Sequence, residues 1–441
     1  CGQKPTLPLK GLKDDSPPGT DASVPGFLCQ RRLMNTRSEY DACLQAMYAM
    51  RRFGIKLELT TIQQMLSGLG DPHKTFQAIH VAGTNGKGSI ASALSTILHL
   101  AGFRTGLFTS PHLVRFNERI RVNNREIAND AVAGACQAVQ SVEPGDREPT
   151  FFEFSTAMAL YEFARQGVQW AVVETGMGGR MDATNLLEPA VSIISNISLE
   201  HREYLGATIA QIAGEKAGII KPDTPVITGV RQKSAIAVLE ETARKRFAPL
   251  HRLGEAFRIR RGRDGAFAYY GLDHVWKGMR TGLAGGFQAD NAALVLAACE
   301  ALMRQGVTLP LEVIREGLMV NRWPGRLEKV SESPYILLDG AHNFMAARNL
   351  GRFLAESLSD RGITLVVGIL DDKPYKAMLQ SLLPVCKRVV FTKARIGRAL
   401  PPEVLAEAAS EMTSNATLIP DVAAAVDHAI RTAGPKDAVC I

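Results

Sequence analysis

A glycine-rich segment between an apolar strand and an apolar helix constrains the fold of this chain more than any other feature. Residues 80–89 read HVAGTNGKGS and follow the apolar run 76–82. Apolar side chains from Ile90 to Ala101 then recur at helical spacing until Gly102. A strand that turns through glycines directly into a helix begins a βαβ unit, so we expect a parallel sheet covered by helices.

The same alternation of short apolar strands and amphipathic helices continues along the chain. Such alternation is typical of a largely parallel sheet with helices on both faces. Residues 260–287, rich in glycine and charge, predict a small antiparallel excursion or loops, and a helix is expected from about Asn291. The predicted strands are 76–82, 104–109, 169–174, 190–197 and 225–230, and the predicted helices are 38–48, 89–101, 128–140, 153–166 and 208–217.

A second alternating set follows the breaker Trp323-Pro324-Gly325 and predicts a separate, smaller domain. We therefore expect an α/β protein in which a P-loop-type, mostly parallel sheet domain precedes a smaller Rossmann-like domain. The predicted divisions are 1–35, a disordered leader or extension, 36–322, the larger domain that contains the glycine-rich segment, and 323–441, a domain truncated at its end because 438–441 resembles a strand just begun. The strands expected in the second domain are 335–339, 363–369, 387–392 and 416–419.

Composition narrows the class of protein. The 441 residues are too many for a single ordinary hydrophobic core. A composition of 46% hydrophobic and 22% charged residues is typical of a globular protein. The net charge of +7 comes without a dense Lys/Arg run, so anionic small substrates explain it as well as nucleic acid does. Seven dispersed cysteines without a C-x-x-C pair, and no membrane-length apolar run, favour a cytoplasmic protein, although Cys1-Gly2 leaves a lipoprotein open.

The glycine-rich segment has the features of a phosphate-binding loop. Glycines let backbone N–H groups approach phosphate oxygens, and the helix N-terminus adds positive potential. Lys87 would reach the β- and γ-phosphates, and Ser89 could contact a metal. The spacing departs from the usual motif, since two residues separate Gly83 from Gly86 and Gly88 precedes Ser89. Taken alone, the loop also fits a GTPase, a kinase or an ordinary strand–helix turn.

The variant AGTNGKGS resembles the ATP loop of the Mur ligase superfamily, especially its folylpolyglutamate/dihydrofolate synthase branch. Further motifs of that branch follow in the same order, from about residue 38 to the end. Ser198, Glu200 and Arg202 differ from the usual pattern around His201. The resembling segments are 109–120 (TSPHLVRFNERI), 174–185 (ETGMGGRMDATN), 196–201 (NISLEH), 214–222 (GEKAGIIKP) and 339–343 (DGAHN).

The resemblance implies ligands for ATP, for two Mg²⁺ ions and for a pterin. Glu174 also ends an apolar strand, where α/β sheets bind ligands, although a solvated glutamate is the ordinary alternative. The aromatic run 151–154 could equally belong to the core. The implied ATP ligands are Thr84, Asn85, Gly86, Lys87, Gly88, Ser89, Asn291, Arg326, Asp339 and His342; the metal ligands are Ser110, Glu174, His201 and Lys216; the substrate-binding residues are Phe151, Phe152, Glu153, Met181, Asp182 and Ala183.

Lys216 lies on the apolar side of a predicted helix that begins with the capping box Thr208-x-x-Gln211. Such a lysine either extends to solvent or performs chemistry. Burial favours the neutral amine, which can react with CO₂. The resemblance implies that Lys216 is carbamylated and binds the second metal, so that Lys87, Lys216 and His201 are the expected catalytic residues.

The resemblance implies a ligase that uses ATP to join L-glutamate to folates, and also to dihydropteroate, through an acyl phosphate. The implied protein is a monomer with small-molecule substrates and neither nucleic-acid nor membrane partners. A monofunctional folylpolyglutamate synthase remains an alternative. A muramyl ligase would need an additional N-terminal domain, for which residues 1–75 are too few, and a nucleotide-binding switch would not need Lys216 or the Asp339 motif.

Overall fold

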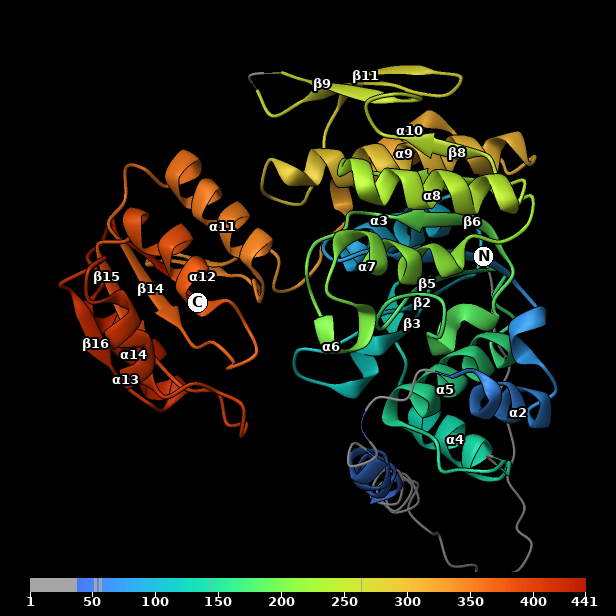
Figure 1. The fold of residues 1–441 in the computed structure, drawn as a ribbon, viewed down its shortest axis with the longest axis horizontal. Coiled ribbons are helices and arrows are strands. Elements are labelled where there is room, and N and C mark those ends of the chain that lie inside the picture. Colours follow the sequence, from blue (N-terminus) through green and yellow to red (C-terminus); the bar gives the residue numbers. More distant parts are fainter. Residues whose placement is uncertain (1–37, 51–53, 55–57, 144, 263) are drawn as a thin grey trace, which may run out of the picture.

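A computed structural model describes residues 38–50, 54, 58–143, 145–262 and 264–441 of the chain (Figure 1). The predicted leader at 1–35 lies outside the described residues. Residues 38–49 form the expected first helix. The α/β fold class is confirmed, because a large, mostly parallel sheet precedes a smaller α/β unit.

Eight strands within the described residues form the larger sheet, in the order β4-β3-β2-β5-β1-β6-β7-β8. The six strands from β2 to β8 are parallel, whereas β3 and β4 add an antiparallel edge. Strand β1, which leads into the glycine-rich loop, therefore lies inside the sheet. The strands are β1 Gln77–Ala82, β2 Thr105–Phe108, β3 Ile120–Val122, β4 Arg125–Glu126, β5 Trp170–Glu174, β6 Pro189–Ile194, β7 Val226–Thr228 and β8 Leu250–Arg252.

Helices cover both faces of this sheet because successive strand residues point in opposite directions. Ile79 and Val81 of β1 pack with α3, α9 and α10, whereas Ala78 and Ala82 face the other side, which α4, α5, α7 and α8 cover. The helices are α2 Thr60–Gly68, α3 Lys87–Leu100, α4 Asn129–Gln140, α5 Phe151–Arg165, α6 Arg202–Leu205, α7 Ile209–Lys216, α8 Lys233–Lys245, α9 Phe287–Arg304 and α10 Leu311–Val320.

The expected antiparallel excursion is present as strands β9 Arg258–Arg261, β10 Phe267–Tyr270 and β11 Val275–Met279, which lie above α9 and α10 in Figure 1. The fully buried Glu300 of α9 joins this sheet to the core. Its carboxylate accepts hydrogen bonds from the Tyr269 hydroxyl at 2.6 Å and from the backbone N–H groups of residues 272, 273 and 274 at 2.7–3.0 Å.

The smaller unit is a six-stranded sheet, in the order β12-β13-β17-β14-β15-β16, within the fully described stretch 264–441. Strand β17 is inserted in parallel between β13 and β14, so the last residues of the given sequence occupy the middle of the sheet. The prediction of a truncated end stays a prediction. The elements are β12 Glu328–Glu332, β13 Tyr335–Leu338, α11 Phe344–Ser357, β14 Ile363–Val367, α12 Tyr375–Leu382, β15 Arg388–Phe391, α13 Pro402–Ala409, β16 Ala416–Leu418, α14 Val422–Thr432 and β17 Ala438–Cys440.

The two sheets are separate in the structure, and the segment between α10 and β12 connects them (Figure 1). We therefore propose the domain boundary at residues 322–323. None of the described helices combines the length and the apolar character that a bilayer crossing requires.

The Glu300 contacts predict a large and local stability effect. Glu300→Gln replaces one acceptor oxygen by an NH₂ group that faces N–H donors, so we expect the free energy of unfolding to fall by about 3 kcal/mol. Asp273→Asn in the same loop removes an exposed ion pair with Arg304 and should cost less than about 1 kcal/mol. Urea titration followed by Trp276 fluorescence measures both. Equal effects of the two substitutions would contradict this role of Glu300.

Candidate functional site

The functional side chains gather at the carboxyl-terminal edge of the larger sheet. The glycine-rich loop follows β1, Glu174 ends the neighbouring β5, Ser110 follows β2, and Asn196 follows β6. Because these strands are parallel and adjacent, their ends meet at one edge, which is where open α/β sheets bind ligands. The sheet order thus brings together residues that are more than 100 positions apart.

The loop is glycine-rich because its backbone passes very close to the segment after β6 and to α9. Gly83 has φ 143° and Gly86 has φ 88°, conformations that L side chains rarely adopt. A Cβ atom at Gly83 would lie 1.9 Å from the Ser195 Oγ, and one at Gly86 would lie 2.6 Å from the Asn291 Oδ1. Substitution at either position would therefore displace the loop.

Side chains from β6 and its following loop hold the phosphate loop in place. The Asn85 carbonyl accepts hydrogen bonds from the Ser195 hydroxyl at 2.7 Å and from the Asn196 Nδ2 at 2.8 Å. The Asn196 Oδ1 in turn accepts the Asn85 N–H at 3.0 Å, and the Thr84 hydroxyl accepts the Ser198 N–H at 3.0 Å. The loop backbone is therefore fixed before any ligand binds.

Lys87 is the first residue of α3, directly after the left-handed Gly86. Its ammonium donates to the Gly83 and Thr84 carbonyls, at 3.2 and 3.4 Å, and lies 3.8 Å from Glu174. The charge is thus placed over the loop, where it could bind phosphate oxygens together with the helix N-terminus. Ser89, two residues further along α3, is buried with its Oγ at 3.4 Å from the Gln288 Nε2.

Glu174 and Ser110 have the chemistry of a magnesium site. The Glu174 carboxylate is buried, and among the described residues one backbone N–H, that of Ser110 at 3.3 Å, donates to it. Burial raises the pKa of Glu174, against the opposing charges of Lys87 and Arg326. A buried carboxylate with so few donors fits a hard cation, which prefers oxygen ligands. Ser110, whose N–H contacts this carboxylate, carries a hydroxyl that could supply a second oxygen.

Lys216 is buried, as its helical pattern predicted, with 1% of the residue exposed. The capping box of its helix is confirmed, since the Thr208 hydroxyl accepts the Gln211 N–H. The Lys216 ammonium donates to the Gly83 carbonyl at 3.0 Å and to Glu200 at 2.9 Å. Burial lowers the pKa of Lys216, and Glu200 opposes that shift. The lysine thus contacts the phosphate loop itself.

His201 is exposed at the N-terminus of α6, next to Glu200, with a left-handed backbone at φ 45°. It is not gathered with Glu174 and other acidic or histidine side chains into one cluster. Among the described residues, the group of three such side chains that comes together is Asp273, His274 and Glu300. That group lies beside the small sheet, where the donors described above engage Glu300, so it fits a structural role.

The second domain contributes residues to the same edge. Asn343, the N-cap of α11, exchanges amide hydrogen bonds with Asn85 at 2.9 and 3.4 Å, which joins the second domain directly to the phosphate loop. Asp339 accepts the Leu327 N–H at 2.9 Å, and burial raises the pKa of Asp339 against the charge of Arg326. His342 Nδ1 lies 3.0 Å from the Gly340 carbonyl oxygen.

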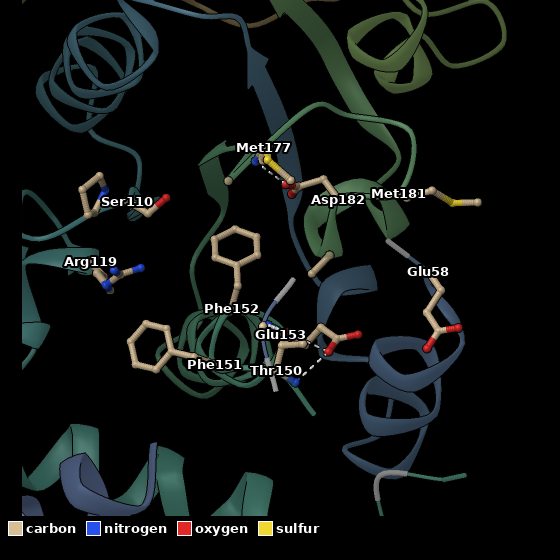
Figure 2. A pocket seen from close by; sticks show the side chains of 14 residues that line it. Glu58, Ser110, Arg119, Thr150, Phe151, Phe152, Glu153, Met177, Met181 and Asp182 are labelled. Atoms are coloured by element: carbon tan, nitrogen blue, oxygen red, sulfur yellow. Dashed lines mark hydrogen bonds between the residues drawn. The ribbon is translucent and has the colours of Figure 1, made fainter. Parts of the chain in front are cut away.

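A largely apolar cavity of about 390 Å³ lies beside Ser110 (Figure 2). Phe151 and Phe152 line it from the first turn of α5. Each ring also packs on the core, Phe152 at 5.9 Å from Phe108 and Phe151 at 6.3 Å from Phe116 between ring centroids. The aromatic run therefore serves both the core and the cavity. The other lining residues are Gly54, Glu58, Ser110, Pro111, Arg119, Thr150, Glu153, Gly176, Met177, Met181, Asp182 and Ala183.

Two buried carboxylates in the cavity wall have different surroundings. Both Glu153 oxygens are engaged by Arg147, at 2.7 and 3.0 Å, and one also caps α5 through Thr150 (Figure 2). Glu153 is therefore suited to shaping the wall, and its contact with substrate stays a prediction. Asp182 accepts the Met177 N–H at 2.8 Å and the Thr184 hydroxyl at 2.5 Å, and burial raises its pKa.

Sequence reasoning assigned no role to several residues of the site. Asn343 belongs to a motif that does not reveal its partner Asn85 across the fold. Thr150 begins a capping box T-x-x-E, which signals its local partner Glu153 but not its place in the cavity wall. Asn196 and Ser195 carried no periodic signal. Arg119 also lines the cavity, with its guanidinium 5.0 Å from the Phe151 ring centroid.

Comparison with known proteins agrees with this geometry. The Mur ligase middle domain matches residues 81–299, and the Mur ligase glutamate ligase domain matches residues 325–441. The dihydrofolate synthase/folylpolyglutamate synthase of Bacillus subtilis is 38% identical over 359 residues, 79% of this chain and 84% of that protein.

Solved structures show the same likeness over nearly the whole chain. Mycobacterium tuberculosis folylpolyglutamate synthase complexed with ADP has a TM-score of 0.85 at 33% identity, over 91% of this chain and 96% of that one. The bifunctional folylpolyglutamate synthase/dihydrofolate synthase of Yersinia pestis complexed with AMPPNP and Mn has a TM-score of 0.81 at 30% identity, over 91% of this chain and 94% of that one.

The fold, the phosphate loop and the second domain define an ATP-dependent acid–amino-acid ligase of the Mur ligase type. Within that class, the chain belongs to the folylpolyglutamate synthase/dihydrofolate synthase family.

The position of Lys87 predicts a severe and specific loss of activity on substitution. Lys87→Ala removes the charge over the loop, so we expect turnover to fall roughly a hundredfold or more while the circular dichroism spectrum is unchanged. Lys233→Ala is a matched control, because Lys233 is also the first residue of a helix but is exposed away from the loop. ADP release measures both variants. Near-normal turnover of Lys87→Ala would remove the assignment of the phosphate loop.

Proposed function

We propose that this chain uses ATP to add L-glutamate to folates and, in the same site, to dihydropteroate. The observation that carries the proposal is the position of Ser110. It lines the apolar cavity, and its N–H binds Glu174 beside the phosphate loop. A flat pterin acid held in the cavity would therefore place its carboxylate next to the γ-phosphate of ATP.

The reaction begins when a carboxylate oxygen of the substrate attacks the γ-phosphorus and ADP leaves, which gives an acyl phosphate. The developing negative charge falls within reach of Lys87 and of the α3 N-terminus. Arg326 acts on the same region, since its positive charge lowers the pKa of both Glu174 and Asp339, against the effect of burial. The protein thus contributes fixed positive charge and positioning.

The amine of L-glutamate then attacks the acyl carbon, phosphate leaves, and the nitrogen loses a proton to give the amide. An acyl phosphate is vulnerable to water, so the site must be closed during this step. The hydrogen bonds between Asn85 and Asn343 hold the two domains together at the phosphate loop. This contact supports a reaction that takes place between the domains.

We propose that two Mg²⁺ ions bind at this edge, the first through Ser110 and Glu174 and the second through His201 and a carbamylated Lys216. The Mn-bound Yersinia pestis structure supports the use of a divalent metal. When bound, such ions would neutralise phosphate charge and orient the reacting oxygens.

Carbamylation of Lys216 would reorganise its contacts. The amine now meets two acceptors, the Gly83 carbonyl and Glu200. A carbamate keeps only one N–H, so one of the two hydrogen bonds must break. Because the carbamate and the Glu200 carboxylate are both negatively charged and repel each other, the hydrogen bond to Glu200 is the one that breaks. The N–H could continue to bind Gly83, which would fix the carbamate against the phosphate loop.

We further propose that the enzyme works as a monomer in the cytoplasm, without nucleic-acid or membrane partners. The basic residues are scattered along the sequence without a dense Lys/Arg run, which supports the absence of a nucleic-acid partner.

Acceptance of dihydropteroate is tested with the wild-type protein. Incubation with dihydropteroate, L-glutamate and MgATP should yield dihydrofolate, because the cavity binds the pterin end, which dihydropteroate shares with folates. Chromatography detects the product, and tetrahydrofolate serves as the parallel substrate. Extension of tetrahydrofolate without any dihydrofolate synthesis would restrict the chain to folylpolyglutamate synthesis. Activity with neither substrate would contradict the proposed function.

The carbamate on Lys216 is tested by ¹³C NMR in ¹³C-bicarbonate. Wild-type protein should show one carbamate carbon that is absent from Lys216→Ala and Lys216→Arg, since neither residue can form this group. Lys221→Ala is the control, because burial also lowers the pKa of Lys221 yet its amine binds the Asn185 carbonyl outside the proposed metal site. Lys216→Ala should lose most ligation while ATP still binds, and a short carboxylic acid should restore part of it. A wild-type spectrum without the carbamate signal would show the idea to be wrong.

A further inference from the structure

A buried chain of hydrogen bonds leads from the wall of the cavity into the core of the sheet. Asp182 lies in the cavity wall across from Phe151 and Phe152 (Figure 2). The Thr184 hydroxyl lies 2.5 Å from the Asp182 Oδ1, and the His80 Nε2 lies 2.7 Å from the same hydroxyl. His80 and Thr184 are completely buried. The reaction described above uses neither residue.

The direction of each of these hydrogen bonds follows from which group carries a proton. The Thr184 hydroxyl has one proton, and the carboxylate of Asp182 is an acceptor, so the hydroxyl donates to Asp182. The hydroxyl must then accept from His80, which requires a proton on Nε2. The His80 Nδ1 is buried and has no hydrogen-bond partner among the described residues, and an unpaired acceptor there costs less than an unpaired N–H.

Burial supports the same arrangement. The pKa of His80 is lowered to about 3 by burial, with a smaller effect of Lys221, so its imidazole is neutral at physiological pH. A neutral Nε2–H imidazole can donate to Thr184 without placing a charge in the core. The backbone N–H groups of Thr184 and Met177, at 3.1 and 2.8 Å, occupy further lone pairs of Asp182.

We propose that His80 and Thr184 are positioning residues that hold Asp182 as a pure hydrogen-bond acceptor toward the cavity. Among the described residues, each hydrogen bond of Asp182 is donated to its carboxylate, so Asp182 can meet a ligand only as an acceptor. The complementary ligand edge carries N–H donors, as the 2-amino-4-oxopyrimidine ring of a pterin does. The inference rests on the proposed function for the identity of this ligand.

His80 also connects the cavity wall to the strand that leads into the phosphate loop. His80 belongs to β1, three residues before Gly83, and it points to the face opposite Ile79 and Val81. The cavity wall and the phosphate loop are therefore tied to the same strand. Loosening Thr184 should alter pterin binding and leave ATP binding intact, because the bonds from Asn196 hold the loop independently.

Two matched pairs of variants test the proposal. Thr184→Val removes the hydroxyl at constant shape, whereas Thr184→Ser keeps it; His80→Leu removes the donor, whereas His80→Gln keeps an N–H near the Nε2 position. Isothermal titration of dihydropteroate and, separately, of ATP gives the Kd values. We expect Thr184→Val and His80→Leu to weaken dihydropteroate binding about tenfold, and the two conservative variants to stay within about twofold. The Kd for ATP should change in none of them.

A readout that needs no ligand separates this inference from the proposed function. The ¹⁵N NMR signals of His80 should show a neutral Nε2–H tautomer from pH 5 to 8 in wild-type protein, and Thr184→Val should shift them. An Nδ1–H tautomer or an imidazolium in that range would overturn the proposal, as would equal dihydropteroate Kd values in wild type and Thr184→Val. If the tautomer and its shift are present but wild type binds no dihydropteroate, the positioning chain stands and the proposed substrate is wrong.

Discussion

The close approach of the phosphate loop to the segment after β6 and to α9 is the constraint on which the rest of the site depends. Gly83 and Gly86 lie where any Cβ atom would collide with Ser195 or Asn291. Because the loop is held this tightly, its carbonyls can fix two lysines at once, Lys87 from the following helix and Lys216 from α7. Backbone geometry thus places both the ammonium of Lys87 and the amine of Lys216, the one that we propose to be carbamylated, before any nucleotide binds.

The same edge of the sheet would bring the two proposed substrates together. Ser110 belongs both to the wall of the apolar cavity and to the surroundings of Glu174, so the proposed pterin and phosphate sites share one segment. The second domain reaches this edge through Asn343, which pairs with Asn85. A cavity, a phosphate loop and a domain contact that share their residues favour a reaction in which substrate position and nucleotide position are coupled.

Much of the fold could be predicted from the sequence because its signals are local. The alternation of strands and helices, the antiparallel excursion and the capping box at Thr208 depend on residues within one or two turns of each other, and all are present. The strand order, the insertion of β17 between β13 and β14, and the bonds of Asn85 with Asn343 join residues far apart, which no local pattern specifies. Glu153 shows the limit of prediction within the site. The resembling segment marks its position, but it does not reveal that Arg147 donates hydrogen bonds to both of its carboxylate oxygens.

The central claim is that the substrate carboxylate attacks ATP to form an acyl phosphate at this edge. Transfer of ¹⁸O tests it most directly. Dihydropteroate, or a folate, labelled with ¹⁸O in the reacting carboxylate is incubated with MgATP and L-glutamate, and the phosphate released is analysed by mass spectrometry. The mechanism predicts one ¹⁸O atom in each phosphate, with ADP as the other product. Unlabelled phosphate, or label recovered in AMP, would contradict it.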